Sequence, residues 1–202
     1  MYSSGSQTVG RAIFSKGAGR VRREQAREAR ARLSQAFDLE EGCFDIIVIK
    51  TTGDRILDRP LKEIGGKGLF TREIEDDLLS GAIDIAVHSM KDMPVAQPDG
   101  LALTTYLPRE DVRDAFVSLD GGKLTDLREG AVVGTSSLRR KAQLLNYRPD
   151  LEIVEFRGNV QTRLKKLKDG VAEATFLAMA GLNRLAMDEV PRTAIEAEEM
   201  LP

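Results

Sequence analysis

The stretch GAVVGTSSLRRKAQLLNYRPD, residues 130–150, decides the fold. A short apolar run leads through a glycine and three hydroxyl residues into a segment with helical periodicity. Two further segments repeat this order: LEIVEFRGNVQTRLKKLKDG, residues 151–170, and ATFLAMAGLNRL, residues 174–185. Their apolar runs lack the clean alternation of a one-sided antiparallel sheet. The pattern predicts an α/β fold with mostly parallel strands.

The same alternation extends towards the N-terminus. FDIIVIK (44–50) and IDIAVHS (83–89) are apolar runs of the strand type, and LFTREIEDDLLSG (69–81) has helical spacing that ends at Gly81. Residues 20–37 are rich in Arg, Glu, Gln and Ala and contain few apolar anchors. We predict a surface helix there, because glutamates are interleaved with the arginines and no aromatic residue suggests RNA binding.

A segment that contains three prolines divides the chain. Residues 94–114, PVAQPDGLALTTYLPREDVRD, also contain the strand-like LALTTYL, and the combination suits a crossing between two lobes. At 202 residues the chain has room for one or two compact domains. We therefore expect two α/β lobes, residues 1–107 and 108–202, with a cleft between them.

Composition excludes several classes of protein. The 42% hydrophobic residues exclude disorder, and 30 basic against 32 acidic residues leave a net charge of −2, which marks no nucleic-acid or membrane-surface protein. The single cysteine, Cys43, and the single histidine, His88, form no zinc-like cluster and fit a reducing cytoplasm. No apolar stretch has the length of a signal peptide or membrane span. We expect a monomer with a small-molecule substrate, no nucleic-acid or membrane partner and no metal.

Polar residues follow each predicted strand, at the edge where parallel sheets bind ligands. After the first two strands come Thr51, Thr52, Gly53 and Asp54, then His88, Ser89, Met90, Lys91 and Asp92. After the next two come Thr135, Ser136 and Ser137, then Arg157, Gly158 and Asn159. The sequence therefore predicts that the chemistry lies at these strand ends.

The motif GTSSLRR, residues 134–140, is the most informative of them. Thr135, Ser136 and Ser137 place hydroxyls and backbone N–H groups at a helix N-terminus, which favours a bound anion. Arg139 and Arg140 fall in the first helical turn, where the helix dipole disfavours a cation unless an anion is bound. The alternative is a serine-capped helix with its arginines in solvent.

A second group of arginines has the same character. Arg157 ends a predicted strand, and Arg163 lies within the first two turns of the helix that follows. Guanidinium groups bind carboxylates with two parallel hydrogen bonds. Together with Arg139 and Arg140, these residues predict a site for a ligand that carries several carboxylates or phosphates.

Two more motifs contribute candidate residues. In HSMKDMP, Lys91 supplies a fixed positive charge and Asp92 a carboxylate that can stabilise a developing cation, although an exposed Lys-Asp turn remains an equal alternative. In EIGGKGLF, glycines present Lys67, but no Ser or Thr follows it as a magnesium-binding phosphate loop requires. Neither His88 nor Cys43 is assigned a catalytic role.

Five spaced motifs carry a resemblance to a known family. They are KTTGDRILDRPLKEIGGKGLFTREIE (50–75), DIAVHSMKDMP (84–94), PREDVRDAFVS (108–118), VGTSSLRRKAQLL (133–145) and FRGNVQTRLKKL (156–167). In this order they are similar to the porphobilinogen deaminases, also called hydroxymethylbilane synthases. The resemblance runs from about Phe44 to Pro202.

The resemblance implies a fold like that of periplasmic binding proteins, with two lobes around a cleft and a third, smaller domain. It implies a transferase of porphyrin and heme biosynthesis that joins four porphobilinogen units into hydroxymethylbilane with loss of ammonia, primed by a covalently held dipyrromethane cofactor. By motif, Asp92 would be the catalytic carboxylate, and Lys67 would lie in a loop near the cleft. Acetate and propionate groups would be held by Lys91, Thr135, Ser136, Ser137, Arg139, Arg140, Arg157 and Arg163, and Ser89 belongs to the same binding set.

Two departures from the family pattern limit the resemblance. The family's opening T-R-x-S-x-L-A-L motif is replaced by FSKGAGRVRREQA, residues 14–26, so no site residue is assigned before Thr51. The chain ends at EMLP, before the third domain and its cofactor-bearing cysteine, for which Cys43 lies in the wrong motif. We expect little or no deaminase activity from this chain alone. The alternatives are a non-enzymatic two-lobe binding protein for a polycarboxylate and a non-functional fragment.

Overall fold

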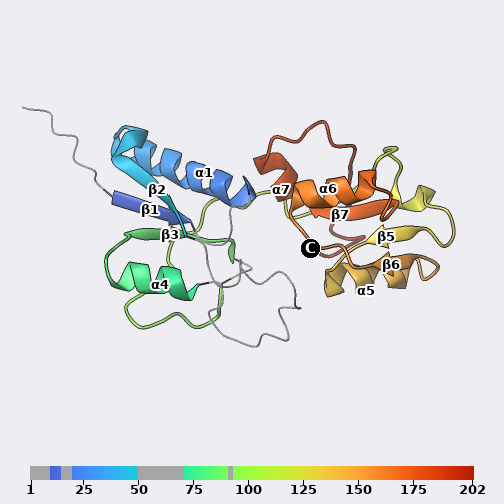
Figure 1. Ribbon diagram of the computed structural model, residues 1–202, viewed down its shortest axis with the longest axis horizontal. Coiled ribbons are helices and arrows are strands. Elements are labelled where there is room, and N and C mark those ends of the chain that lie inside the picture. Colours follow the sequence, from blue (N-terminus) through green and yellow to red (C-terminus); the bar gives the residue numbers. More distant parts are fainter. Residues whose placement is uncertain (1–9, 15–19, 50–70, 91–92) are drawn as a thin grey trace, which may run out of the picture. The chain divides into compact units, whose positions relative to one another are not determined.

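A computed structural model describes residues 10–14, 20–49, 71–90 and 93–202. The chain divides into two compact units, Met1–Leu107 and Pro108–Pro202 (Figure 1). Each unit has its own sheet, so each is described by itself. The predicted residues Thr51 to Asp54, Lys67, Lys91 and Asp92 lie outside the described residues.

The first unit has a three-stranded parallel sheet in the order β2-β1-β3. The central strand, β1, precedes the segment 14–26 in which the sequence departs from the family pattern and shares only Phe14 with it. The elements in chain order are β1 (Gly10–Phe14), α1 (Arg20–Phe37), η1 (Glu41–Cys43), β2 (Phe44–Val48), α4 (Arg72–Leu79) and β3 (Ile85–Val87).

Helices α1 and α4 pack against this sheet. Helix α1 contacts all three strands, and its buried residues, Ala26 and Ala29, are small enough to allow a close approach. Helix α4 packs beside β3 through Ile74, which is fully buried together with Ile83. Gly81, at φ 71°, follows the helix in the left-handed conformation that ends many helices, which confirms the predicted stop.

The second unit has a five-stranded mixed sheet in the order β6-β5-β7-β4-β8. Strands β5, β6 and β7 run parallel, whereas β4 is antiparallel to both β7 and β8. The elements are β4 (Asp114–Ser118), η3 (Leu124–Asp126), β5 (Val132–Gly134), α5 (Leu138–Tyr147), β6 (Glu152–Val154), α6 (Val160–Lys168), β7 (Ala174–Ala178), α7 (Met179–Arg184) and β8 (Thr193–Ala194).

Helices cover both faces of this sheet, with α5 on one side and α6 and α7 on the other (Figure 1). Two apolar clusters result. On the α5 side Phe116 and Phe176 meet edge to face at 5.7 Å, and Leu144 of α5 packs with them. On the other side Phe156 and Leu182 form the second cluster with Val117. Strand β4 is buried along its whole length because its side chains enter both clusters.

The direction of β4 determines which residues share an edge. The parallel strands β5, β6 and β7 end at Gly134, Val154 and Ala178. Because β4 is antiparallel, its first residue, Asp114, pairs with Ala178. We call this side of the sheet, where β5 to β7 end and β4 begins, the tip edge, and the side where β5 to β7 begin the opposite edge.

The sequence-based expectations for the elements mostly hold. The three strand-turn-helix segments predicted between residues 130 and 185 are β5-α5, β6-α6 and β7-α7, and the predicted surface helix is α1. The strand-like LALTTYL, residues 101–107, forms no strand, because it pairs with no described neighbour. Strands β1, β4 and β8 were not predicted.

Candidate functional site at the tip edge

Hydroxyl groups shape the turn between β5 and α5. Ser137 caps the helix, accepting a hydrogen bond from the backbone N–H of Arg140 at 3.4 Å. The hydroxyl of Thr135, which is buried, accepts one from the N–H of Ser137 at 3.2 Å. The hydroxyl of Ser136 reaches the neighbouring strand end and accepts one from the N–H of Phe156 at 2.9 Å. The three hydroxyls therefore fix the helix start relative to the end of β6.

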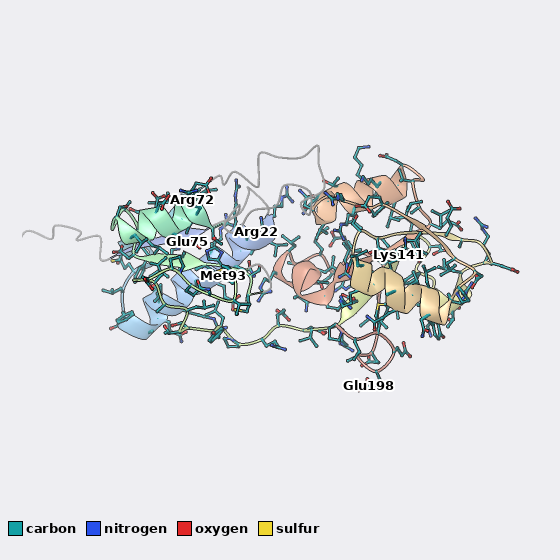
Figure 2. All side chains as sticks on the ribbon, turned by 90° about the horizontal axis from the view of Figure 1, so that it is seen from below. Arg22, Arg72, Glu75, Met93, Lys141 and Glu198 are labelled. Atoms are coloured by element: carbon teal, nitrogen blue, oxygen red, sulfur yellow. The ribbon has the colours of Figure 1, made fainter. Side chains whose placement is uncertain are left out.

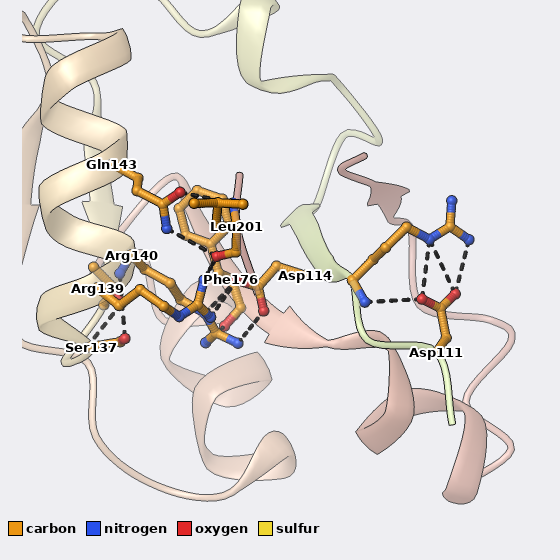
Figure 3. A network of polar contacts seen from close by, with 10 residues as sticks. Asp111, Asp114, Ser137, Arg139, Arg140, Gln143, Phe176 and Leu201 are labelled. Carbon is orange, nitrogen blue, oxygen red and sulfur yellow. Dashed lines mark hydrogen bonds and ion pairs between the residues drawn. The ribbon is translucent and has the colours of Figure 1, made fainter. Parts of the chain in front are cut away.

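Two arginines of the first turn of α5 converge on one buried carboxylate, Asp114 (Figure 3). The Nη2 of Arg140 donates to Oδ1 at 2.7 Å and its Nε to Oδ2 at 3.0 Å, which is a bidentate pair. The Nη2 of Arg139 donates to the same Oδ2 at 2.8 Å. Asp114 is 2% exposed, so the network closes the start of β4 against solvent.

The carboxylate of Asp114 is ionised in this network. Its burial raises the pKa, but the hydrogen bonds and charges of Arg140 and then Arg139 outweigh burial, so the net shift is downward. One negative charge thus faces two positive charges. The network keeps a net positive charge at the helix start, where the helix dipole is also positive.

The chain beyond β8 joins the same network. The backbone carbonyl of Leu201 accepts hydrogen bonds from Nη1 of Arg139 and, at 3.0 Å, from Nε2 of Gln143. The N–H of Leu201 returns a bond to Oε1 of Gln143 at 2.8 Å, and Met200 is buried in the core on the α5 side. Arg139 is therefore held at two points, by Asp114 and by Leu201.

The remaining predicted arginines lie on and before α6. Arg157 pairs with Glu155 at 2.9 Å. Hydrogen bonds from Arg157 and Ser136 lower the pKa of the Glu155 carboxyl. Arg163 is half-buried, and its Nε donates to the carbonyl of Gly158 at 3.0 Å. Among the described residues it makes no ion pair. Burial lowers the pKa of Arg163, the charge of Arg140 lowers it further, and the charge of Glu155 raises it by less.

Comparison with known families decides the assignment. Residues 20–202 match the sequence model described as "Porphobilinogen deaminase, dipyromethane cofactor binding domain". The chain belongs to the porphobilinogen deaminase family.

Individual relatives agree with this assignment. The chain is 70% identical over 178 residues to a porphobilinogen deaminase of Paracoccus denitrificans, a match that covers 88% of this chain and 57% of the relative. It is 57% identical over 180 residues to a chloroplastic porphobilinogen deaminase of Oryza sativa, covering 88% and 50%. A relative from Nitrobacter hamburgensis is 50% identical over 202 residues, covering 100% and 64%. The chain thus spans about half to two thirds of the length of these relatives.

Solved structures support the two-lobe α/β architecture expected of the family. A probable amino-acid ABC transporter extracellular-binding protein from Bacillus subtilis matches with a TM-score of 0.51 and 13% identity, covering 93% of this chain and 78% of that one. At this identity the likeness concerns the fold alone. It agrees with the expectation of a periplasmic-binding-protein-like fold.

The residues predicted for porphobilinogen deaminase chemistry divide into three groups. The tip edge of the second unit brings together the hydroxyls of residues 135–137 and the four arginines: Arg139, Arg140, Arg157 and Arg163. Ser89 lies in the first unit, half-buried, 3.2 Å from the side-chain amide of Gln25. Lys67, Lys91 and Asp92 are outside the described residues, so their predicted roles stay predictions, as does the cleft between the lobes.

Sequence reasoning missed one member of the site, Asp114. A signal for it existed: the run DAFVS begins with a carboxylate and continues with residues that are buried in the sheet. A charge at the mouth of a buried strand needs a partner. The partner could not be named from the sequence, because Arg139 and Arg140 come 25 and 26 residues later.

The chemistry of the tip edge fits the family's dipyrromethane. Arg139 and Arg140 share Asp114 and Arg157 pairs with Glu155, whereas Arg163 makes no ion pair among the described residues. A ligand with acetate and propionate groups supplies the anions that this surplus of positive charge favours. Among the described residues no His, Cys, Asp and Glu cluster could hold a metal ion, and no helix has the length and apolar character for crossing a membrane.

Proposed function

We propose that this protein acts as a hydroxymethylbilane synthase, a transferase that joins four porphobilinogen units with loss of ammonia. Its second unit binds the carboxylates of substrate and product. Family membership and the cationic tip edge together support this proposal.

One observation carries the proposal: the environment of Arg163. Its guanidinium is half-buried and has no ion pair among the described residues; burial and the charge of Arg140 lower its pKa, and the charge of Glu155 raises it by less. A partly desolvated cation beside a second cation is unfavourable unless an anion balances them. Acetate and propionate groups on a pyrrole chain would provide that anion.

The other residues of the tip edge complete the binding surface. Arg139, 38% exposed in its side chain, has N–H donors beyond those used by Asp114 and Leu201. Arg157 is half exposed and adds a second carboxylate-binding group. The backbone N–H groups at the start of α5 add the positive end of the helix dipole. When bound, the dipyrromethane would supply the primer on which successive pyrrole units are assembled.

The reaction itself needs a negative charge near the carbon that loses ammonia. By resemblance to the family, Asp92 is the carboxylate that stabilises this positive charge, and Lys91 binds a substrate carboxylate. Lys67 belongs to the same proposed surface through the glycine-rich motif around it. These assignments rest on the quoted motifs.

The experiment is an assay of the purified protein, expressed from its complete reading frame, for porphobilinogen consumption and ammonia release. We expect turnover for the protein expressed from its complete reading frame, little or none for residues 1–202 alone, and loss of turnover in Asp92→Ala. Arg163→Gln should raise the KM for porphobilinogen about tenfold, the effect of removing one charge-assisted hydrogen-bonding group. Lys141→Gln, which removes an exposed charge from α5 (Figure 2), is the matched control and should leave the KM unchanged.

Two outcomes would contradict the proposal. A protein that binds porphobilinogen but never releases ammonia would be a non-enzymatic receptor. Full turnover by Asp92→Ala would remove the proposed chemistry even if carboxylate binding at the tip edge were retained.

A further inference from the structure

Asp114 is a costly residue at its position. It opens a strand whose other side chains are buried, and it is itself 2% exposed. A buried ion pair contributes little net stability compared with apolar residues of similar volume, because both charges lose their hydration. A carboxylate here therefore calls for an explanation other than stability of the core.

The two arginines bound to Asp114 have different surroundings. Arg140, with 11% of its side chain exposed, donates twice to the carboxylate and once, at 3.0 Å, to the carbonyl of Phe176. This arginine alone would satisfy the buried charge. Arg139 is 38% exposed and donates to Asp114 with one nitrogen and to Leu201 with the other. Arg140 is thus the buried member of the network, and Arg139 is the exposed member.

The contact between Arg139 and Asp114 is unexpected at the position that Arg139 occupies. It lies in the first turn of α5, where the helix dipole disfavours a cation and where Arg140 adds a like charge. Left to itself, a flexible guanidinium would turn towards solvent. Two fixed acceptors hold it at the helix start with N–H donors remaining.

We propose that Asp114 is a positioning residue, which holds the guanidinium of Arg139 at the tip edge in the orientation that binds a carboxylate of the pyrrole ligand. The inference rests on the proposed function, because it names how that same surface is kept ready. Asp114 acts through Arg139, while the buried Arg140 holds the Asp114 carboxylate in place.

The test compares Asp114→Asn with Asp150→Asn. Asp150 provides the matched control: it also makes a bidentate pair, with Arg148 at 2.7 and 2.6 Å, but at the opposite edge. The readouts are the KM and kcat for porphobilinogen and the Kd of a synthetic dipyrromethane tetracarboxylate. We expect Asp114→Asn to raise KM and Kd about tenfold, the loss of one charge-assisted contact, with kcat within about twofold. Asp150→Asn should change neither KM nor Kd.

A second variant keeps the charge and removes the geometry. Arg139→Lys retains a cation, but one ammonium cannot bridge Asp114, Leu201 and a ligand carboxylate as a planar guanidinium does. We expect about the same rise in Kd as in Arg139→Gln, and none in Lys141→Gln on the same helix. This exposed site remains testable if Asp114→Asn fails to fold.

A double-mutant cycle separates positioning from a structural role. If Asp114 acts through Arg139, Asp114→Asn should add less than about twofold to the Kd once Arg139 is Gln, whereas a structural role gives multiplying effects. Multiplying effects, or wild-type affinity in Arg139→Lys, would overturn the inference while leaving the proposed function standing. An unchanged protein that neither consumes porphobilinogen nor binds the tetracarboxylate would instead overturn the proposed function.

Discussion

The two edges of the second unit's sheet use arginine in opposite ways. At the opposite edge each pairs with its own carboxylate: Arg148 with Asp150 at 2.6 Å and Arg128 with Glu173 at 2.6 Å. Arg148 also donates to the backbone carbonyls of Leu124 and Leu127, which joins the η3 turn to the end of α5. The arginines there neutralise charge and tie loops together.

At the tip edge Arg113 pairs with both Asp111 and Glu196, whereas four further arginines around α5 and α6 have two carboxylate partners among the described residues. Arg139 and Arg140 share Asp114, Arg157 pairs with Glu155, and Arg163 is half-buried without an ion pair among the described residues. Electrostatics alone would disperse these cations into water. The contrast teaches that arginine content is no guide to function in this domain, whereas the balance between arginines and their carboxylate partners is.

The largest difference between the edges should appear when a carboxylate is removed. Asp114→Ala leaves Arg140 buried without its partner, and we expect a loss of about 3–5 kcal/mol in the free energy of unfolding, typical of half of a buried ion pair. Asp150→Ala removes the partner of Arg148, which already contacts solvent, and should lower the free energy of unfolding far less. Urea unfolding of both variants measures the difference, and equal losses would remove the contrast between the edges.

Glycine substitutions should come next in size. A Cβ on Gly134, at the tip edge, would lie 2.4 Å from ring atoms of the buried Phe156, so Gly134→Ala should destabilise by about 1–3 kcal/mol. At the opposite edge Gly130, at φ 69°, has no such neighbour, and Ala there should cost about 1 kcal/mol of backbone strain.

Gly181→Ala is the control for these two substitutions. It has helical backbone and only an ordinary contact, 4.0 Å from Val160, and should be neutral or slightly stabilising. Thermal unfolding ranks the three variants. A tolerated Gly134→Ala would mean that the strand ends are less tightly packed than described.

Acid should weaken the tip edge through Asp114. Its pKa is lowered in the folded state, so its contribution to stability is complete above the unfolded value near 4 and is lost as the pH falls through the folded value. The difference in unfolding free energy between the unchanged protein and Asp114→Asn should therefore shrink below about pH 4. A difference that stays constant from pH 7 to pH 3 would show that folding does not lower the pKa of this carboxyl.

The smallest expected effect is an increase in the free energy of unfolding when Arg163 is replaced by an apolar residue. Arg163→Met removes a half-buried cation that lacks an ion pair among the described residues, and it should raise the unfolding free energy by up to about 1 kcal/mol while weakening tetracarboxylate binding. Arg148→Met, at the opposite edge, should lower stability and leave binding unchanged. Denaturant midpoints and ligand titrations of the two variants give both signs, and a stability loss in Arg163→Met would contradict the comparison.

Local patterns predicted the elements whose strand and helix are adjacent in the chain. The β5-α5 and β6-α6 units follow from an apolar run, a polar turn and a capping residue, and Ser137 and Asn159 do cap their helices. Strand β4 was missed, whereas the strand-like LALTTYL forms no strand. Pairing with strands far along the chain, rather than local propensity, makes β4 a strand.

The same limit applies to the site. Residues 135–137 and the arginines were predictable because strand ends carry ligands, and dipole arguments singled out Arg139 and Arg140. Their protein partner, Asp114, was not predictable, since nothing local links the start of β4 to the start of α5. The anion expected from the ligand is in part supplied by the protein itself.

The reversal of β4 also bears on when this surface can form. Asp114 reaches its arginines only after β4 has inserted between β7 and β8, and its register partner in β7 is Ala178. The pairing of β4 with β7 closes a long segment of chain, so contacts that depend on it form later than helices do. A nascent or partly unfolded chain would have α5 and both arginines without their anchor. We therefore expect carboxylate binding at the tip edge to be acquired late in folding, together with β4, and to be lost when β4 is released.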